Sequence, residues 1–226
     1  MNRKIFLDVE TTGLCFKQGH KIIEIAAVEM LDRKLTGNNF HTYINPQRKI
    51  DQEATNVHKI RNEFLSDKPL FIQVADEFLN FIGKSELIIH NANFDLGFLN
   101  NELKNIYHQF GNIQDNNSII DTLEMARNKY MGKKNSLDAL CKRFDIDYTE
   151  RQEKGHGALL DSKILYEVYI CMTSQQMSFS LKEKKKTSKC TQYIFSVKKK
   201  SPIIIKASQM EIYRHENFFN GFKSNN

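Results

Sequence analysis

The chain has 226 residues, of which 40% are hydrophobic and 27% are charged, and its mean hydropathy is −0.52. This length suits one full domain plus an appendage. No apolar run approaches the roughly 20 residues that span a bilayer, and the N-terminus shows no apolar stretch followed by a cleavage site. We therefore expect a cytoplasmic protein with no membrane partner.

Charge is distributed unevenly along the chain, whose net charge is +6. Residues 181–226 carry 11 Lys and Arg against 3 Asp and Glu, a net charge of +8. Residues 1–180 carry 22 against 24, a net charge of −2. A basic chain alone hints at nucleic acid, but here the body is slightly acidic. Any nucleic-acid affinity of the body must come from metal ions or from a local patch.

Strand and helix patterns follow one another through the first three-quarters of the chain. Short segments rich in β-branched residues predict strands, and apolar residues at helical spacing predict helices. Strands are expected over residues 4–9, 21–31, 39–45, 86–90 and 118–121, and helices over 69–82, 93–103, 122–131, 136–144 and 157–172. Strands come first and then alternate with helices, which predicts an α/β fold with a mixed β-sheet flanked by helices.

The character of the chain changes near Thr173. Residues 181–190 are dense in charge and poor in apolar side chains, which is typical of a linker. Residues 202–219 have enough apolar side chains to dock on another protein but too few to form a core. We predict a folded domain over residues 1–175, a flexible basic linker over 176–200 and a docking segment over 201–226.

Two carboxylates stand near the start of the chain. Asp8 and Glu10 are separated by one residue on a predicted strand, so their side chains point to the same face. Buried carboxylates are unfavourable unless they are paired or bind a cation, and oxygen ligands suit Mg²⁺ or Mn²⁺. Thr11 begins a turn that ends at Gly13 and can bring backbone close to a ligand. Taken alone, the pair is more often a solvated strand end.

Three further polar residues follow predicted elements. Asp95 comes straight after a buried strand, where Asn91 or Asn93 can cap the next helix. His156 lies between two glycines, and Asp161 lies one turn into the following helix. A mobile histidine beside a metal-binding carboxylate can accept a proton from water. Each residue alone has a structural explanation, so the order of all five is the stronger signal.

That order resembles the DEDD exonuclease superfamily. D-x-E-T-T-G comes first, N-x-x-F-D follows, and H-x-x-x-x-D comes last. The histidine subclass is indicated because Gly157 occupies the position at which the tyrosine subclass has Tyr. The resemblance implies a ribonuclease H-like exonuclease fold. It also implies two divalent metal ions, Mg²⁺ or Mn²⁺, with His156 as the general base, and as their ligands Asp8, Glu10, Asp95 and Asp161.

Longer runs narrow the resemblance to the proofreading epsilon subunits of bacterial DNA polymerase III. The runs GHKIIEIAAVE, LTGNNFH, IHNANFDLGF and HGALLD extend it over nearly all of residues 3–173. It implies an exodeoxyribonuclease that removes mismatched nucleotides from a DNA 3′ terminus. Through the pattern D-x-E-A-x-x-V-H it implies that Glu53 and His58 also face the terminal nucleotide. The implied substrate-binding residues are then Asp8, Glu10, Thr11, Glu53, His58 and Asp161.

The resemblance also implies partners. The segment over residues 201–226 would bind the polymerase alpha subunit, and a theta-like subunit and the sliding clamp are further candidates. The stretch SQQMSF at 174–179 keeps Met177 and Phe179 of a clamp motif but has no glutamine at its first position. The loop over residues 14–18 is shorter than the family's usual loop.

Two alternatives remain open at this stage. An RNA 3′-end trimming exonuclease of the same subclass would carry the same motifs, because only contacts to the 2′-hydroxyl separate the substrates. An inactive structural subunit of a polymerase is the second alternative. All five catalytic positions are present, which favours an enzyme.

Overall fold

The computed structural model describes residues 3–109, 111–174 and 209–210. All but the last two belong to the first of two compact units of the chain, Met1–Leu181. The linker predicted over 176–200 therefore lies outside the described residues, as does the predicted docking segment except for Gln209 and Met210. No helix in the described part is long and apolar enough to cross a bilayer.

The described domain alternates strands and helices in the order expected. The strands are β1 (Arg3–Thr11), β2 (Ile22–Leu31), β3 (Lys34–Tyr43), β4 (Glu86–Ile89) and β5 (Ile119–Asp121). The α-helices are α1 (Gln52–His58), α2 (Asn62–Leu65), α3 (Phe71–Ile82), α4 (Ala92–Ile106), α5 (Thr122–Lys129), α6 (Leu137–Phe144), α7 (Thr149–Lys154) and α8 (Ala158–Ser174), and the 3₁₀ turns are Phe16–Gln18 and Ile113–Asp115.

The five strands form one mixed sheet in the order β3-β2-β1-β4-β5. β1 is antiparallel to β2 and parallel to β4, which is parallel to β5. The predicted mixed sheet is thus confirmed. Because β1, β4 and β5 run the same way, their carboxyl ends meet at one edge of the sheet. The chain that leaves each of these strands starts from this edge.

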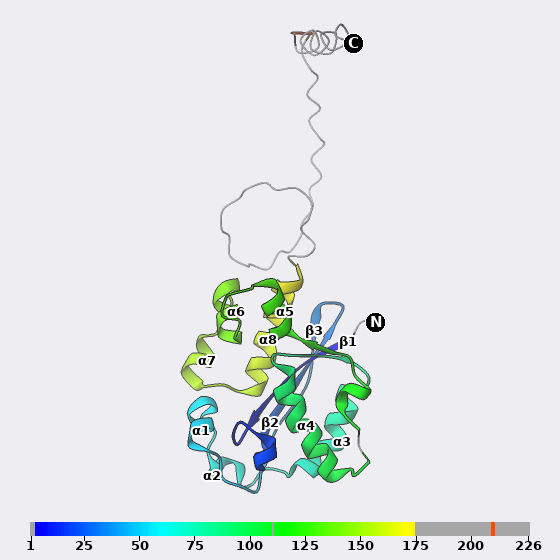
Figure 1. Cartoon of the computed structure of the whole chain (residues 1–226), viewed down its shortest axis with the longest axis vertical. Helices are drawn as coiled ribbons and strands as arrows, with labels where there is room; N and C mark the ends of the chain where they lie inside the picture. The colour runs from blue at the N-terminus through cyan, green and yellow to red at the C-terminus, as the bar shows by residue number, and fades with distance from the viewer. Residues whose placement is uncertain (1–2, 110, 175–208, 211–226) are drawn as a thin grey trace. The chain divides into compact units, whose positions relative to one another are not determined.

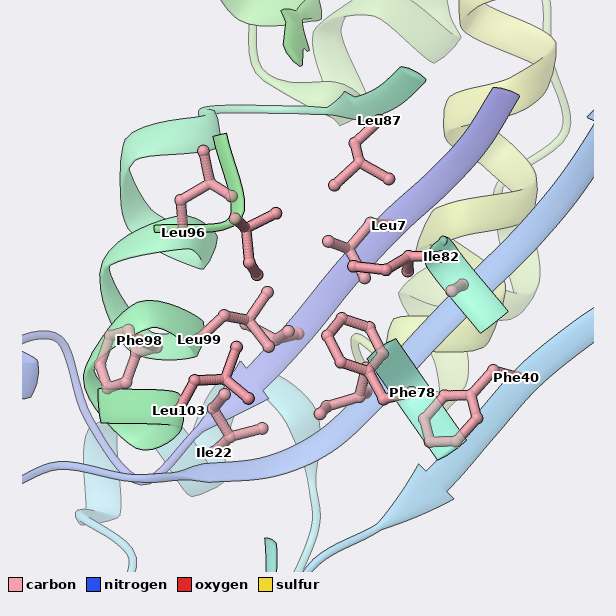
Figure 2. Packing of buried hydrophobic residues seen from close by; sticks show 14 of the residues in the cluster. Leu7, Ile22, Phe40, Phe78, Ile82, Leu87, Leu96, Phe98, Leu99 and Leu103 are labelled. Atoms are coloured by element: carbon pink, nitrogen blue, oxygen red, sulfur yellow. The ribbon is translucent and has the colours of Figure 1, made fainter. Parts of the chain in front are cut away.

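Alternation along β1 divides the core between the two faces of the sheet. Ile5, Leu7 and Val9 belong to a cluster with α3 and α4, part of which is shown in Figure 2. Phe6 packs on the opposite face, against apolar residues of α5, α6 and α8. In Figure 1, α4 lies on one side of the blue β1 strand and α6 on the other. Asp8 shares the phase of Phe6, so it points toward the α8 side of the sheet.

The structure adds elements that the sequence analysis did not include. α1, α2 and α7 are each seven residues or fewer and bury one residue each, so no apolar periodicity marks them. β3 begins at Lys34 rather than near residue 39, because a tight hairpin turn joins it directly to β2. Asp32 and Arg33 form that turn with φ of 47° and 67°, the left-handed pair that suits the twist of a hairpin.

Candidate active site

The five predicted catalytic residues line one cavity of about 690 Å³. Asp8 and Glu10 come from the end of β1, Asp95 from the first turn of α4, His156 from the loop before α8, and Asp161 from the first turn of α8. Residues far apart in the sequence thus meet at the edge where the parallel strands end. This edge is the usual place for a ligand in sheets of this kind.

The turn after β1 is shaped by close packing. Thr11 donates its hydroxyl to the carbonyl of Gly13 at 2.8 Å. A Cβ atom at Gly13 would lie 2.3 Å from the His20 ring, so any other residue would force that buried ring to move. The ring Nδ1 of His20 in turn lies 3.1 Å from the hydroxyl of Thr12. The turn at Thr11–Gly13 therefore brings the Gly13 backbone close to the His20 imidazole. These contacts hold the end of β1, which carries Glu10.

Asp95 is held by the strand beside it. The residue is 3% exposed, and its Oδ1 accepts the Val9 backbone N–H at 3.1 Å. The expected cap by an asparagine side chain is wrong: Asn91 is at the N-cap position with φ of 71° and makes no side-chain bond there. Instead Asp121, at the end of β5, accepts the N–H groups of Asn91 and Ala92 at 3.1 and 3.0 Å. The helix start is thus tied to the neighbouring strand.

A buried arginine that the sequence analysis did not single out binds Asp161. Arg151 donates Nε to Asp161 Oδ1 at 2.7 Å and Nη2 to Oδ2 at 3.0 Å. It also donates Nη1 to Asp138 and lies with Nη2 3.2 Å from His156 Nδ1. Such a forked pair is strong and directional. No motif marks Arg151, because its partners are set by the way α7 packs beside α6 and α8.

His156 is positioned by backbone contacts. Its N–H donates to the Val57 carbonyl at 3.1 Å, and the preceding Gly155 has φ of 89°. Burial and the nearby Arg151 charge lower the pKa of the His156 ring, so the ring is mainly neutral at pH 7. A guanidinium only donates hydrogen bonds, so Nδ1 accepts from Arg151 and the neutral ring carries its proton on Nε2.

The carboxylates of the cavity repel one another. Burial, followed by repulsion from Asp161 and Asp95, raises the pKa of Asp8 well above its usual value. The pKa of Glu10 is raised well above its usual value by burial, by Asp161 and by Glu24. Burial raises the pKa of Asp95 to about 8. The cluster therefore favours protons or cations at this edge of the sheet.

The residues of the cavity fit divalent cations. Glu10, His156 and Asp161 each offer one ligand atom, and these atoms lie within 4.8 Å of one another. Asp8 and Asp95 lie outside this closest set but line the same cavity. Carboxylate oxygens are the ligands that Mg²⁺ and Mn²⁺ prefer, and burial together with mutual repulsion raises the pKa values of Asp8 and Glu10, so a bound cation would stabilise the ionised group.

The other predicted substrate residues line an adjoining cavity of about 490 Å³, which contains Glu10, Thr11, Glu53 and His58. His58 is 4% exposed, and its Nδ1 accepts the Ile60 N–H at 3.0 Å. Burial lowers the pKa of His58 to about 4, so the ring is neutral with its proton on Nε2. That Nε2 is buried and lies close to the Thr11 backbone.

Comparison with known proteins agrees with the fold. The exonuclease family model RNase_T matches residues 5–169. The solved structure of Exonuclease X in complex with 5′ overhanging duplex DNA aligns with a TM-score of 0.59 and 29% identity, covering 78% of this chain and 93% of that one. With the mixed sheet and the carboxylate cavity, these matches define the class: an exonuclease with a ribonuclease H-like fold.

Closer relatives narrow the class. The DNA polymerase III subunit epsilon of Rickettsia felis is 46% identical over 219 residues, which cover 96% of this chain and 95% of the relative. The same subunit of Escherichia coli strain K12 is 50% identical over 184 residues, covering 80% of this chain and 75% of the relative. The chain belongs to the exonuclease family and, within it, to the epsilon subunits of DNA polymerase III. The family predicted from the motifs is confirmed.

Proposed function

We propose that the chain is a 3′→5′ exodeoxyribonuclease that proofreads for the replicative DNA polymerase III in the cytoplasm. It removes mismatched 3′-terminal nucleotides by hydrolysing the last phosphodiester bond. The observation that carries the proposal is the single cavity in which four carboxylates and a histidine meet, in a chain of the epsilon family.

Asp8, Glu10, Asp95 and Asp161 would hold two divalent cations, Mg²⁺ or Mn²⁺. When bound, such ions activate a water molecule and neutralise the phosphate that is attacked. The four side chains supply charge in a fixed frame, because two come from a buried strand and two from the first turns of helices. The protons favoured by the raised pKa values of Asp8 and Glu10 must leave when the cations bind.

His156 would remove the proton of the attacking water. Its lowered pKa keeps the ring neutral and ready to accept that proton. Nδ1 lies 3.2 Å from the Arg151 guanidinium, so this lone pair becomes available once that bond opens. The glycines on both sides, Gly155 and Gly157, give the loop the conformational freedom for such a movement.

Thr11, Glu53 and His58 would hold the terminal nucleotide in the adjoining cavity. Apolar side chains of Leu14, Val57 and Phe94 line the same space. Only an unpaired 3′ end can enter. A mismatched terminus unpairs at lower cost than a matched one, which gives selectivity without recognition of the base.

The C-terminal part would tether the enzyme to the polymerase. The alignment with the Rickettsia felis subunit covers 96% of the chain, so it includes most of the sequence after Ser174 and supports a family role for that part. The segment over 201–226 would bind the polymerase alpha subunit through a linker over 176–200, at high effective concentration. A theta-like subunit and the sliding clamp are further proposed partners.

A 5′-labelled DNA primer–template with a 3′ mismatch tests the activity, compared with the matched duplex and an RNA oligomer. With Mg²⁺ we expect stepwise shortening, fastest on the mismatched DNA, and no shortening with EDTA. Faster trimming of the RNA would favour the RNA-trimming alternative, and no cleavage of any substrate would favour a structural subunit. A chain shortened to end at Ser174 should keep the activity and lose binding to the alpha subunit.

A further inference from the structure

One side of the catalytic cavity is lined by basic residues. Arg127, Lys133 and Lys134 line the same 690 Å³ space as the carboxylates. They come from the end of α5 and from the loop between α5 and α6. All three are exposed, and within residues 3–109 and 111–174 none of their side chains forms an ion pair or hydrogen bond. We call these three residues the basic flank.

The loop that carries the two lysines is held in place. Arg143 donates to the Lys134 carbonyl at 2.7 Å and to Asn135 Oδ1 at 2.9 Å. The Arg143 guanidinium also lies 4.5 Å from the centre of the Tyr130 ring. Asn135 itself is 8% exposed. The backbone is therefore fixed while the lysine side chains remain available, as in a binding surface that exists before its ligand arrives.

The flank differs from the rest of the domain. The first 180 residues have a net charge of −2, yet three cations line the cavity that holds the carboxylates. The adjoining cavity, which shares Glu10 and Phe94 with the catalytic cavity, is lined by apolar Leu14, Val57 and Phe94. The basic residues of one cavity and the apolar residues of the other thus suit the two parts of a nucleic-acid strand, because bases favour apolar contacts and phosphates favour Lys and Arg.

We propose that the basic flank binds the backbone phosphates upstream of the terminal nucleotide. This inference rests on the proposed nuclease function and adds the path of the strand, from the flank across the carboxylates to the apolar residues of the adjoining cavity. Phosphate contacts of this kind position the strand without reading its sequence. The flank would therefore strengthen binding of every DNA 3′ end, mismatched or not.

The test measures how fast the full chain and its variants hydrolyse two substrates. One is a single-stranded DNA oligomer. The other is thymidine 5′-monophosphate esterified to p-nitrophenol, which has the bond to be hydrolysed and no upstream phosphate. The test variant is Lys133→Gln with Lys134→Gln. The control is Lys34→Gln with Lys84→Gln, which removes two exposed positive charges at the opposite end of the sheet.

For the test variant we expect KM for the oligomer to rise several-fold with kcat little changed. The slope of log kcat/KM against log salt should become shallower by about 1.4, since each contact to a single strand contributes about 0.7. Hydrolysis of the nitrophenyl ester should equal that of wild type, and the control should match wild type on both substrates.

Equal salt slopes for wild type and the test variant would overturn the assignment, as would a parallel loss on both substrates. If wild type hydrolysed neither substrate, the proposed nuclease function would fail and the basic flank with it. If wild type hydrolysed both substrates, but the salt slope for the oligomer were the same in wild type and the test variant, the nuclease function would stand and the flank alone would be refuted.

Discussion

The carboxylates on the strand and the carboxylate on α8 differ in how their negative charge is compensated. Asp8 and Glu10, on the strand, have strongly raised pKa values and accept no side-chain hydrogen bond within the described domain. Asp161, on α8, accepts hydrogen bonds from Arg151 with both of its carboxylate oxygens. The strand half, Asp8 and Glu10, therefore carries charge that the protein leaves unpaired. The half on α8, Asp161, is neutralised by Arg151, and Asp95 on α4 resembles the strand half in its raised pKa.

This difference separates two tasks. A rigid β-strand can hold like charges together, because the backbone of β1 pairs with β2 as far as Glu10 and the Val9 N–H is bound by Asp95, and such charges attract cations. The Arg151 guanidinium contacts both Asp161 and His156. The proposed proton acceptor and a proposed metal ligand are therefore positioned by the same side chain. Four experiments test this contrast, in order of expected effect.

Removing one charge from the strand half should have the largest effect. Asp8→Asn should lower the rate of hydrolysis at least about 10²-fold, because the proposed cations lose a ligand. Without metal the variant should be at least as stable as wild type, since a buried repulsion has been removed. Rates on mismatched DNA and melting in EDTA measure both effects, with Asp67→Asn, at an exposed site, as the control. Near-normal activity would contradict the role of Asp8.

Removing the proton acceptor comes next. His156→Ala should also lower the rate at least about 10²-fold while leaving the fold intact. The wild-type rate should fall as pH drops below the lowered pKa of His156, because the protonated ring can no longer accept a proton. A pH–rate profile of both proteins checks this. If His156→Ala kept near-normal rates and the same fall in rate at low pH as wild type, another group would be the base.

Breaking the half on α8 should mainly affect stability. Arg151→Gln leaves buried Asp161 without its partner, and the loss of one member of a buried pair costs about 3 kcal/mol. Denaturant unfolding in EDTA measures the change. Lys154→Gln removes the same charge from the same short helix, but at an exposed ion pair with Glu150, and should leave stability unchanged. Equal effects in the two variants would refute a special role for Arg151.

The pH dependence of stability should differ with and without metal. Burial raises the pKa of Asp95 to about 8 in the folded state, against its usual value of 3.8. Between these values the folded state holds a proton that the unfolded state releases, so stability falls as pH rises from 5 to 8. Saturating Mg²⁺ should weaken or reverse this fall, because cations bind the ionised carboxylates. A thermal melt that is flat across this range in EDTA would argue against the raised pKa.

The fold and the residues of the cavity were largely predictable from the sequence. Alternation along the strand placed Asp8 and Glu10 on one face, and the order of three motifs indicated Asp95, His156 and Asp161. Each of these signals is local, since it depends on spacing within one element. The cavity shows that the three elements converge, which the resemblance to the family had implied.

The features of the site that could not be predicted from the sequence depend on contacts between elements. Arg151 meets Asp161 only because α7 packs beside α8, and Asp121 replaces the expected Asn91 cap because β5 ends beside β4. The short helix α1 carries His58 yet buries one residue, too few for a periodic pattern. The linker and the docking segment stay predictions.

The most direct measurement is anomalous scattering from crystals of the protein soaked with Mn²⁺. We predict two peaks in the catalytic cavity, in contact with oxygens of the strand pair Asp8 and Glu10 and of Asp95 and Asp161, and their loss in Asp8→Asn. No peak in the cavity, at Mn²⁺ concentrations that support hydrolysis, would contradict the claim that the unpaired carboxylates of the strand exist to bind metal.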